Sequence, residues 1–221
     1  MTQSVEKTQR LQELHHQGQQ SPWLDNLRRG WITSGELDTW VTSGIRGLTS
    51  NPAIFQKAIE GSEDYDPQFR ELIKDGIAVK QAYWDLVTSD IRGALKALYP
   101  VYQASNGIDG FVSVEVDPAL ARDTARTTTD ARSLHELINA PNLMVKIPGT
   151  TEGLPSIRTM ILARFNSGRG ERDGPADGPP RAVAAGERFD RTHSQFYMGD
   201  ARCVEAAEPE EAETTGARSM T

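Results

Sequence analysis

The chain has 221 residues, of which 37% are hydrophobic and 25% are charged, and its formal net charge is −7. These values are typical of a soluble globular protein of one or two domains. No run of about 18 apolar residues is present, which excludes a transmembrane helix, and the net negative charge disfavours a nucleic-acid partner. Residues 1–20 are polar and contain no apolar stretch, so we expect no signal peptide, and the single cysteine, Cys203, cannot form an internal disulfide. We therefore expect a cytoplasmic protein.

The composition changes near residue 166. Residues 166–221 contain no leucine, isoleucine, tryptophan or lysine, whereas residues 1–165 keep an ordinary mixture. Leucine and isoleucine supply much of a protein core, and a segment without them buries too little surface to offset its chain entropy. We expect residues 1–165 to form the folded domain. Residues 166–221 are expected to be a low-complexity tail, either a disordered extension or the product of a shifted reading frame.

The first predicted elements are short. A helix is expected over residues 8–17, an extended segment over 21–27, and a second helix over 35–42. Residues 47–52 predict a strand that ends at a proline, and residues 53–59 predict a helix.

The later elements are longer, and strands alternate with helices. A helical period runs over residues 66–105 with an interruption at Gly76, and it is followed by strands over 111–118 and 142–148 and by helices over 123–139 and 154–165. The helix over 123–139 is expected to bury Ala131, Leu134, Leu137 and Ile138. Four βα units of this kind predict an α/β fold with a parallel sheet, either doubly wound or part of a (β/α)₈ barrel.

Polar residues recur at the carboxyl ends of the predicted strands. Side chains alternate across a strand, so the valines at 112, 114 and 116 share one face while Glu115 lies on the other. The same alternation places Lys146 on the mixed face of the last strand, and Asp25 and Asn51 hold equivalent positions on the first two. Each residue alone is explained by an ion pair or a hydrogen bond inside the fold. Four of them at four successive strand ends form the pattern of a barrel active site.

A lysine in the middle of a strand indicates a particular chemistry. Burial favours the neutral amine, which is a nucleophile towards carbonyl carbons and forms Schiff bases. A neighbouring carboxylate such as that of Glu115 favours the charged amine, so the protonation state of the lysine has to be controlled. The pattern predicts imine formation at Lys146, with Glu115 and Asp25 moving protons directly or through a water molecule.

Four motifs carry a family resemblance. They are Trp-Leu-Asp-Asn-Leu-Arg-Arg at 23–29, Gly-Leu-Thr-Ser-Asn-Pro-Ala-Ile-Phe at 47–55, Val-Glu-Val-Asp-Pro at 114–118 and Val-Lys-Ile-Pro at 145–148. In this order and spacing the chain resembles the transaldolases of the bacterial type, within the class I Schiff-base aldolases. The resemblance covers roughly residues 5–162.

The resemblance implies a (β/α)₈ barrel, of which about the first four units are present, and a transferase of the pentose phosphate pathway and carbohydrate metabolism. Such enzymes move a dihydroxyacetone unit from sedoheptulose 7-phosphate to glyceraldehyde 3-phosphate, without a metal or an organic cofactor. Lys146 would be the Schiff-base lysine, and Asp25 would handle the proton of the C4 hydroxyl. Glu115 would assist the carbinolamine steps through a water molecule, while Asn51, with Thr49 beside it, would bind the dihydroxyacetone hydroxyls. The expected partners are therefore small sugar phosphates.

The resemblance ends before the later strands of such a barrel. After residue 161 the expected fifth strand with its Asn-Val-Thr run is missing, as are the serine and arginines that would bind the substrate phosphate. Two alternatives to a transaldolase therefore stay open at this point: a class I aldolase that cleaves or isomerises, and a non-catalytic half-barrel. The sequence does not indicate an oligomeric state.

Overall fold

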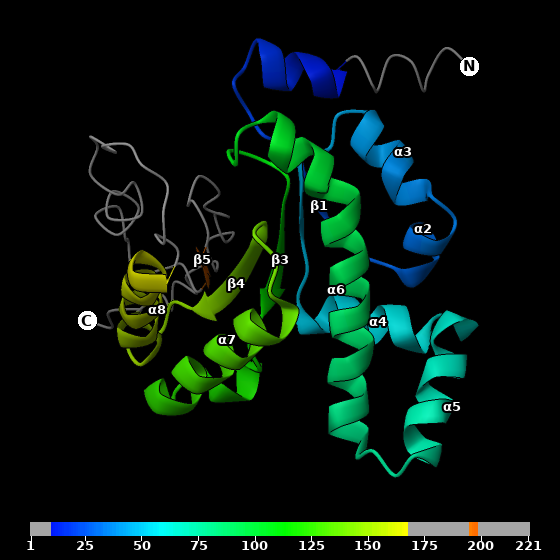
Figure 1. Cartoon of the computed structure of the whole chain (residues 1–221), viewed down its shortest axis with the longest axis vertical. Coiled ribbons are helices and arrows are strands. Elements are labelled where there is room, and N and C mark those ends of the chain that lie inside the picture. Colours follow the sequence, from blue (N-terminus) through cyan, green and yellow to red (C-terminus); the bar gives the residue numbers. More distant parts are fainter. Residues whose placement is uncertain (1–9, 168–194, 199–221) are drawn as a thin grey trace, which may run out of the picture.

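Strands and helices alternate through the described part of the chain, which is residues 10–167 and 195–198 of this computed structural model (Figure 1). The strands are β1 (Trp23–Asp25), β2 (Gly47–Thr49), β3 (Phe111–Glu115), β4 (Leu143–Pro148) and β5 (Gln195–Met198). The helices are α2 (Arg29–Thr33), α3 (Glu36–Thr42), α4 (Pro52–Glu60), α5 (Asp66–Lys74), α6 (Val79–Ala104), α7 (Thr124–Ile138) and α8 (Gly153–Ser167). Two 3₁₀ turns, η1 (Glu63–Tyr65) and η2 (Pro118–Leu120), complete the set, and residues 10–16 are also helical.

The first four strands form a parallel sheet in chain order. β1 pairs with β2, β2 with β3 and β3 with β4, and a helical connection separates each strand from the next. In a doubly wound sheet the strand order reverses at a switch point, and no reversal occurs among these four strands. The arrangement is therefore that of four successive units of a (β/α)₈ barrel, as predicted.

Local sequence explains where several helices begin. The Asn51 side chain accepts a hydrogen bond from the Ile54 amide at 2.9 Å, and Pro52 occupies the first position of α4. The Asp123 carboxylate accepts one from the Arg126 amide at 2.9 Å at the start of α7. The Asn51 cap thus starts α4 directly after the end of β2, whereas η2 lies between the end of β3 and the start of α7.

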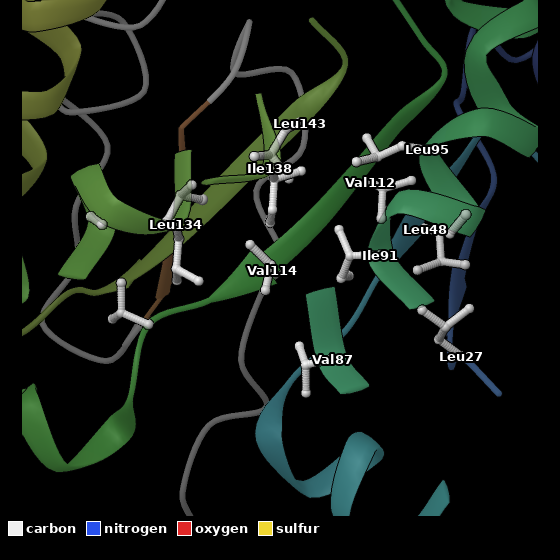
Figure 2. Close-up of a cluster of buried hydrophobic side chains, with 14 of the residues drawn as sticks. Leu27, Leu48, Val87, Ile91, Leu95, Val112, Val114, Leu134, Ile138 and Leu143 are labelled. Atoms are coloured by element: carbon white, nitrogen blue, oxygen red, sulfur yellow. The ribbon is translucent and has the colours of Figure 1, made fainter. Parts of the chain in front are cut away.

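The main hydrophobic core lies between the strands and helices α6 and α7. Figure 2 shows Ile91 and Leu95 of α6 beside Val112 and Val114 of β3, with the α7 side chains gathered towards β4. Figure 1 shows the long helix α6 running alongside β1 and β3. The aliphatic face of β3 and β4 is thus covered by helices, which confirms the predicted division into an aliphatic and a mixed face.

Some details differ from the expectations. The strands β2 and β3 each end three residues earlier than predicted, and α2 was not predicted. Leu137 was expected in the core, but it is 52% exposed. The buried face of α7 passes through Leu134 and Ile138, and Leu137 lies outside it. None of the helices in the described ranges is long and apolar enough to span a membrane.

The predicted tail falls mostly outside the described residues. Helix α8 continues to Ser167, and β5 pairs antiparallel with β4, although no strand was expected after residue 165. Four residues are too few to show an alternation of apolar and polar side chains, and this segment contains no leucine or isoleucine that would mark the apolar positions. The division into residues 1–165 and 166–221 stays a prediction.

Candidate active site

Lys146 and Glu115 form a buried charge pair at the carboxyl ends of two adjacent strands. Their backbones are register partners between β3 and β4, and Lys146 Nζ lies 3.6 Å from Glu115 Oε2. Their side chains are only 2% and 7% exposed. The structure therefore brings Lys146 and Glu115, two of the predicted site residues, side by side.

The pair contributes little net stability to the fold. At this distance the attraction between unit charges is about 4–5 kcal/mol for an effective dielectric constant of about 20. Removing the two charges from water costs several kcal/mol per ion, which is of the same size. A buried pair whose attraction and desolvation nearly cancel is weak evidence for a role in stability, so the two groups remain candidates for chemistry at the strand ends.

Hydroxyl side chains at the end of β2 and within β3 form hydrogen bonds beside the charge pair. Ser113 Oγ donates to Thr49 Oγ1 at 2.9 Å, and both side chains are buried. Ser50 Oγ donates to the Ser113 carbonyl at 2.7 Å, just beyond the Leu48–Val112 pair where the recorded β2–β3 register ends. Hydroxyl groups thus link β2 to β3 near Glu115 and Asn51.

Asp25 is the exposed last residue of β1 and is the register partner of Thr49. It therefore lies at the same edge of the sheet as the other predicted residues. Asn51 follows two residues after Thr49, and its side-chain oxygen is held by the amide of Ile54. This cap fixes the amide plane, so its NH₂ end is the part suited to donate hydrogen bonds to substrate hydroxyls.

An open groove of about 680 Å³ borders the site between α4, α6 and η2. Tyr83 of α6 lines it, and burial, followed by the charges of Asp117 and Glu115, raises the pKa of the Tyr83 phenol to about 12. Lys80 Nζ lies 2.7 Å from Asp117 Oδ2, and this hydrogen bond lowers the pKa of the Asp117 carboxyl. The phenol is thus neutral at physiological pH in the electrostatic field of Glu115.

The floor of the mixed face is apolar. Phe111 and Met144 are each 1% exposed, and Trp23 and Tyr102 pack against them. The rings of Tyr102 and Phe111 meet edge to face, with centroids 5.4 Å apart. An apolar layer therefore lies on the mixed face before the carboxyl ends of the strands that carry Glu115 and Lys146.

Two residues near the site were missed by reasoning from the sequence. Ser113 lies two positions before Glu115, so alternation alone placed it on the same face, but a serine carries no distinctive signal. Tyr83 comes from a helix remote in sequence, and no motif indicated it. In the part of the chain that the structure describes, no group of three or more histidine, cysteine, aspartate or glutamate residues could hold a metal ion.

Comparison with known families agrees with this geometry. The sequence profile described as Transaldolase/Fructose-6-phosphate aldolase matches residues 22–165, which is more than half of the chain and contains all five predicted site residues. The chain belongs to the transaldolase/fructose-6-phosphate aldolase family. The family is one of enzymes, and its (β/α) barrel accounts for the four parallel units described above.

Several curated transaldolases are similar to the chain. "Transaldolase 2" of Nostoc punctiforme is 47% identical over 160 residues, covering 72% of this chain and 42% of the relative. "Transaldolase" of Thermobifida fusca is 47% identical over 152 residues, covering 68% and 41%. "Transaldolase" of Mycobacterium ulcerans is 38% identical over 185 residues, covering 79% and 50%. The chain thus spans two fifths to one half of the length of these relatives.

Proposed function

We propose that the chain carries the Schiff-base chemistry of a transaldolase, in which a dihydroxyacetone unit passes from sedoheptulose 7-phosphate to glyceraldehyde 3-phosphate through Lys146. The observation that carries the proposal is the buried amine of Lys146, 3.6 Å from the Glu115 carboxylate at the carboxyl end of the sheet. The names of the relatives support the same reaction class. A cytoplasmic location is part of the proposal.

The first steps make the imine. The neutral Lys146 amine attacks the C2 carbonyl of the ketose phosphate and gives a carbinolamine. Glu115, through a water molecule, delivers a proton to the departing hydroxyl, which leaves as water and gives the iminium ion. The short distance between the two side chains suits this transfer, since a general acid has to lie within hydrogen-bond reach directly or through one water.

The next steps break and remake a carbon–carbon bond. Asp25 takes the proton of the C4 hydroxyl, the C3–C4 bond breaks, and its electron pair moves into the iminium to give an enamine. The shortened aldose phosphate leaves, and the enamine then attacks the carbonyl carbon of the acceptor aldehyde. This forms the new carbon–carbon bond and restores the iminium, while Asp25 returns its proton to the new alkoxide. Asn51 and Thr49 hold the hydroxyls of the three-carbon unit during the exchange, and hydrolysis then restores the Lys146 amine. The iminium is the electron sink, so no cofactor enters these steps.

Borohydride trapping tests the proposal. The chain is incubated with fructose 6-phosphate, reduced, digested and analysed by mass spectrometry. We expect a stable adduct on Lys146, no adduct in Lys146→Ala, and normal trapping in Lys96→Ala, which removes an exposed lysine of α6. Trapping that persists in Lys146→Ala, or a folded unsubstituted chain without any adduct, would contradict the assignment.

A second reaction, cleavage without transfer, is suggested by the family description, which also includes fructose-6-phosphate aldolase. Adding an aldose phosphate acceptor separates the two. Under the proposal the three-carbon unit appears in a new ketose phosphate. Release of free dihydroxyacetone in the presence of the acceptor would favour the aldolase instead.

A further inference from the structure

A buried polar network connects the segment after Asp25 to the long helix α6. Arg29 Nε donates to Asp90 Oδ1 at 2.8 Å, and the Tyr65 hydroxyl donates to Asp90 Oδ2 at 2.8 Å. Arg29 also donates from its guanidinium to the Leu86 carbonyl at 3.3 Å. The guanidinium carbon of Arg29 lies 4.4 Å from the centre of the Tyr65 ring. One arginine is thus held by two elements, η1 and α6.

The network also satisfies a helix terminus. Arg29 is the first residue of α2, and the first backbone N–H groups of a helix have no partner within it. The Arg29 amide donates to the Tyr65 hydroxyl at 3.2 Å, so Tyr65 accepts from the backbone while it donates to Asp90. The three residues therefore fix the start of α2 through its backbone as well as through a side chain.

The network is buried, which makes it costly to break. Asp90 is 2% exposed and the Arg29 side chain 12% exposed. Burial, followed by the charge of Asp90, raises the pKa of the Tyr65 phenol, so the hydroxyl keeps the proton that it donates. Removing one partner of a buried ion pair leaves the other charge buried without an opposite charge, which is strongly destabilising. This energetic cost holds the side chains of the network in one arrangement.

The position of the network relates it to the site. Asp25 ends β1 and Arg29 begins α2, so at most about 13 Å of extended chain separates them. Leu27 lies between them and is completely buried in the main core. Helix α6, which carries Asp90, also packs against β3, the strand that ends at Glu115. The network therefore connects the chain beside Asp25 to the element that supports Glu115.

We infer that Arg29, Tyr65 and Asp90 are positioning residues that set the place of Asp25 relative to Glu115 and Lys146. This inference rests on the proposed function, in which Asp25 acts in carbon–carbon cleavage while imine formation depends on Lys146 and Glu115. Loosening the network then slows cleavage more than imine formation. Uncleaved sugar accumulates on Lys146.

The test combines trapping with hydrogen exchange in the whole chain. Tyr65→Phe removes the bridging hydroxyl and keeps the ring under Arg29, and Asp90→Asn removes the charge. Tyr99→Phe, which changes a half-exposed tyrosine of α6, is the matched control. After incubation with fructose 6-phosphate and reduction, mass spectrometry measures the ratio of six-carbon to three-carbon adducts on Lys146.

We expect the ratio of six-carbon to three-carbon adduct to rise about tenfold or more in Tyr65→Phe, and to rise also in Asp25→Ala, because small displacements of a catalytic group reduce rates by this order. The backbone amides of residues 24–30 exchange faster in Tyr65→Phe, and Tyr99→Phe changes neither quantity. A general loss of stability lowers both adducts together and leaves their ratio unchanged.

Two results would overturn the inference alone: unchanged exchange in residues 24–30, or faster exchange with an unchanged adduct ratio. Tyr65→Phe keeps the ion pair and is the milder change, so the test stands even where Asp90→Asn fails to fold. A folded unsubstituted chain without any adduct on Lys146 would overturn the proposed function, and this inference with it.

Discussion

The packing of α6 against β3 makes a quantitative prediction for Ile91→Ala. Ile91 is completely buried and lies beside Val112 and Val114 (Figure 2). The substitution removes three carbon groups at about 0.8 kcal/mol each, or about 2.4 kcal/mol, and leaves a cavity whose cost adds to that. The higher helix propensity of alanine offsets a few tenths of a kcal/mol. We expect the free energy of unfolding to fall by about 3 kcal/mol.

Urea denaturation followed by far-ultraviolet circular dichroism measures this change. Ile73→Ala is the matched control, because Ile73 also lies in a helix but is 40% exposed, and it should cost less than about 1 kcal/mol. In a thermal melt the midpoint should fall by about 10 °C for Ile91→Ala. Equal costs for the two variants, or a transition without cooperativity in the unsubstituted chain, would refute the reasoning that α6 and the four strands share one packed core.

Three further predictions follow from single positions. Gly110 has a φ of +81°, and a Cβ there would lie 2.2 Å from the backbone nitrogen of Tyr102, so Gly110→Ala should cost at least about 2 kcal/mol in urea denaturation; a neutral result would show that the backbone relaxes. Asn51→Ala removes the cap of α4 and should cost about 1 kcal/mol, with Gln56→Ala, an exposed position of the same helix, as the control. The pKa of Tyr83 is raised to about 12, so the phenol loses its proton at a lower pH in the unfolded chain than in the folded chain, and the free energy of unfolding falls as pH rises from about 10 to 12. Urea midpoints measured over this range should therefore fall less steeply in Tyr83→Phe. The same dependence of the midpoint on pH in both chains would contradict the assigned burial of Tyr83.

The parts of the fold that could be predicted are those that depend on local periodicity. Strand and helix alternation placed the four βα units, and the face of β3 that carries Glu115 followed from the period of two. Leu137 shows the limit on a helix. It is adjacent in sequence to the buried Ile138, and a pattern of apolar residues does not define the exact edge of a buried stripe.

The candidate site divides in the same way. Glu115 and Lys146 could be paired because adjacent parallel strands bring equivalent ends together. The contacts of Arg29 could not be predicted, because Tyr65 and Asp90 come from segments distant in the chain and buried polar networks leave no periodic pattern in the sequence. Ser113 could be placed on a face, but its bond to Thr49 required the spacing between two strands.

The direct register of Glu115 with Lys146 has a genetic consequence. Both residues lie within one β–α–β segment, and their separation is fixed by the backbone pairing of two neighbouring strands. A pair drawn from opposite sides of a barrel would require the ring of strands to close, whereas this pair does not. A recombination or fission event outside β3–α7–β4 therefore leaves the reactive pair intact. Under the proposed function, the two groups that form the imine are therefore inherited together on one contiguous segment of the chain.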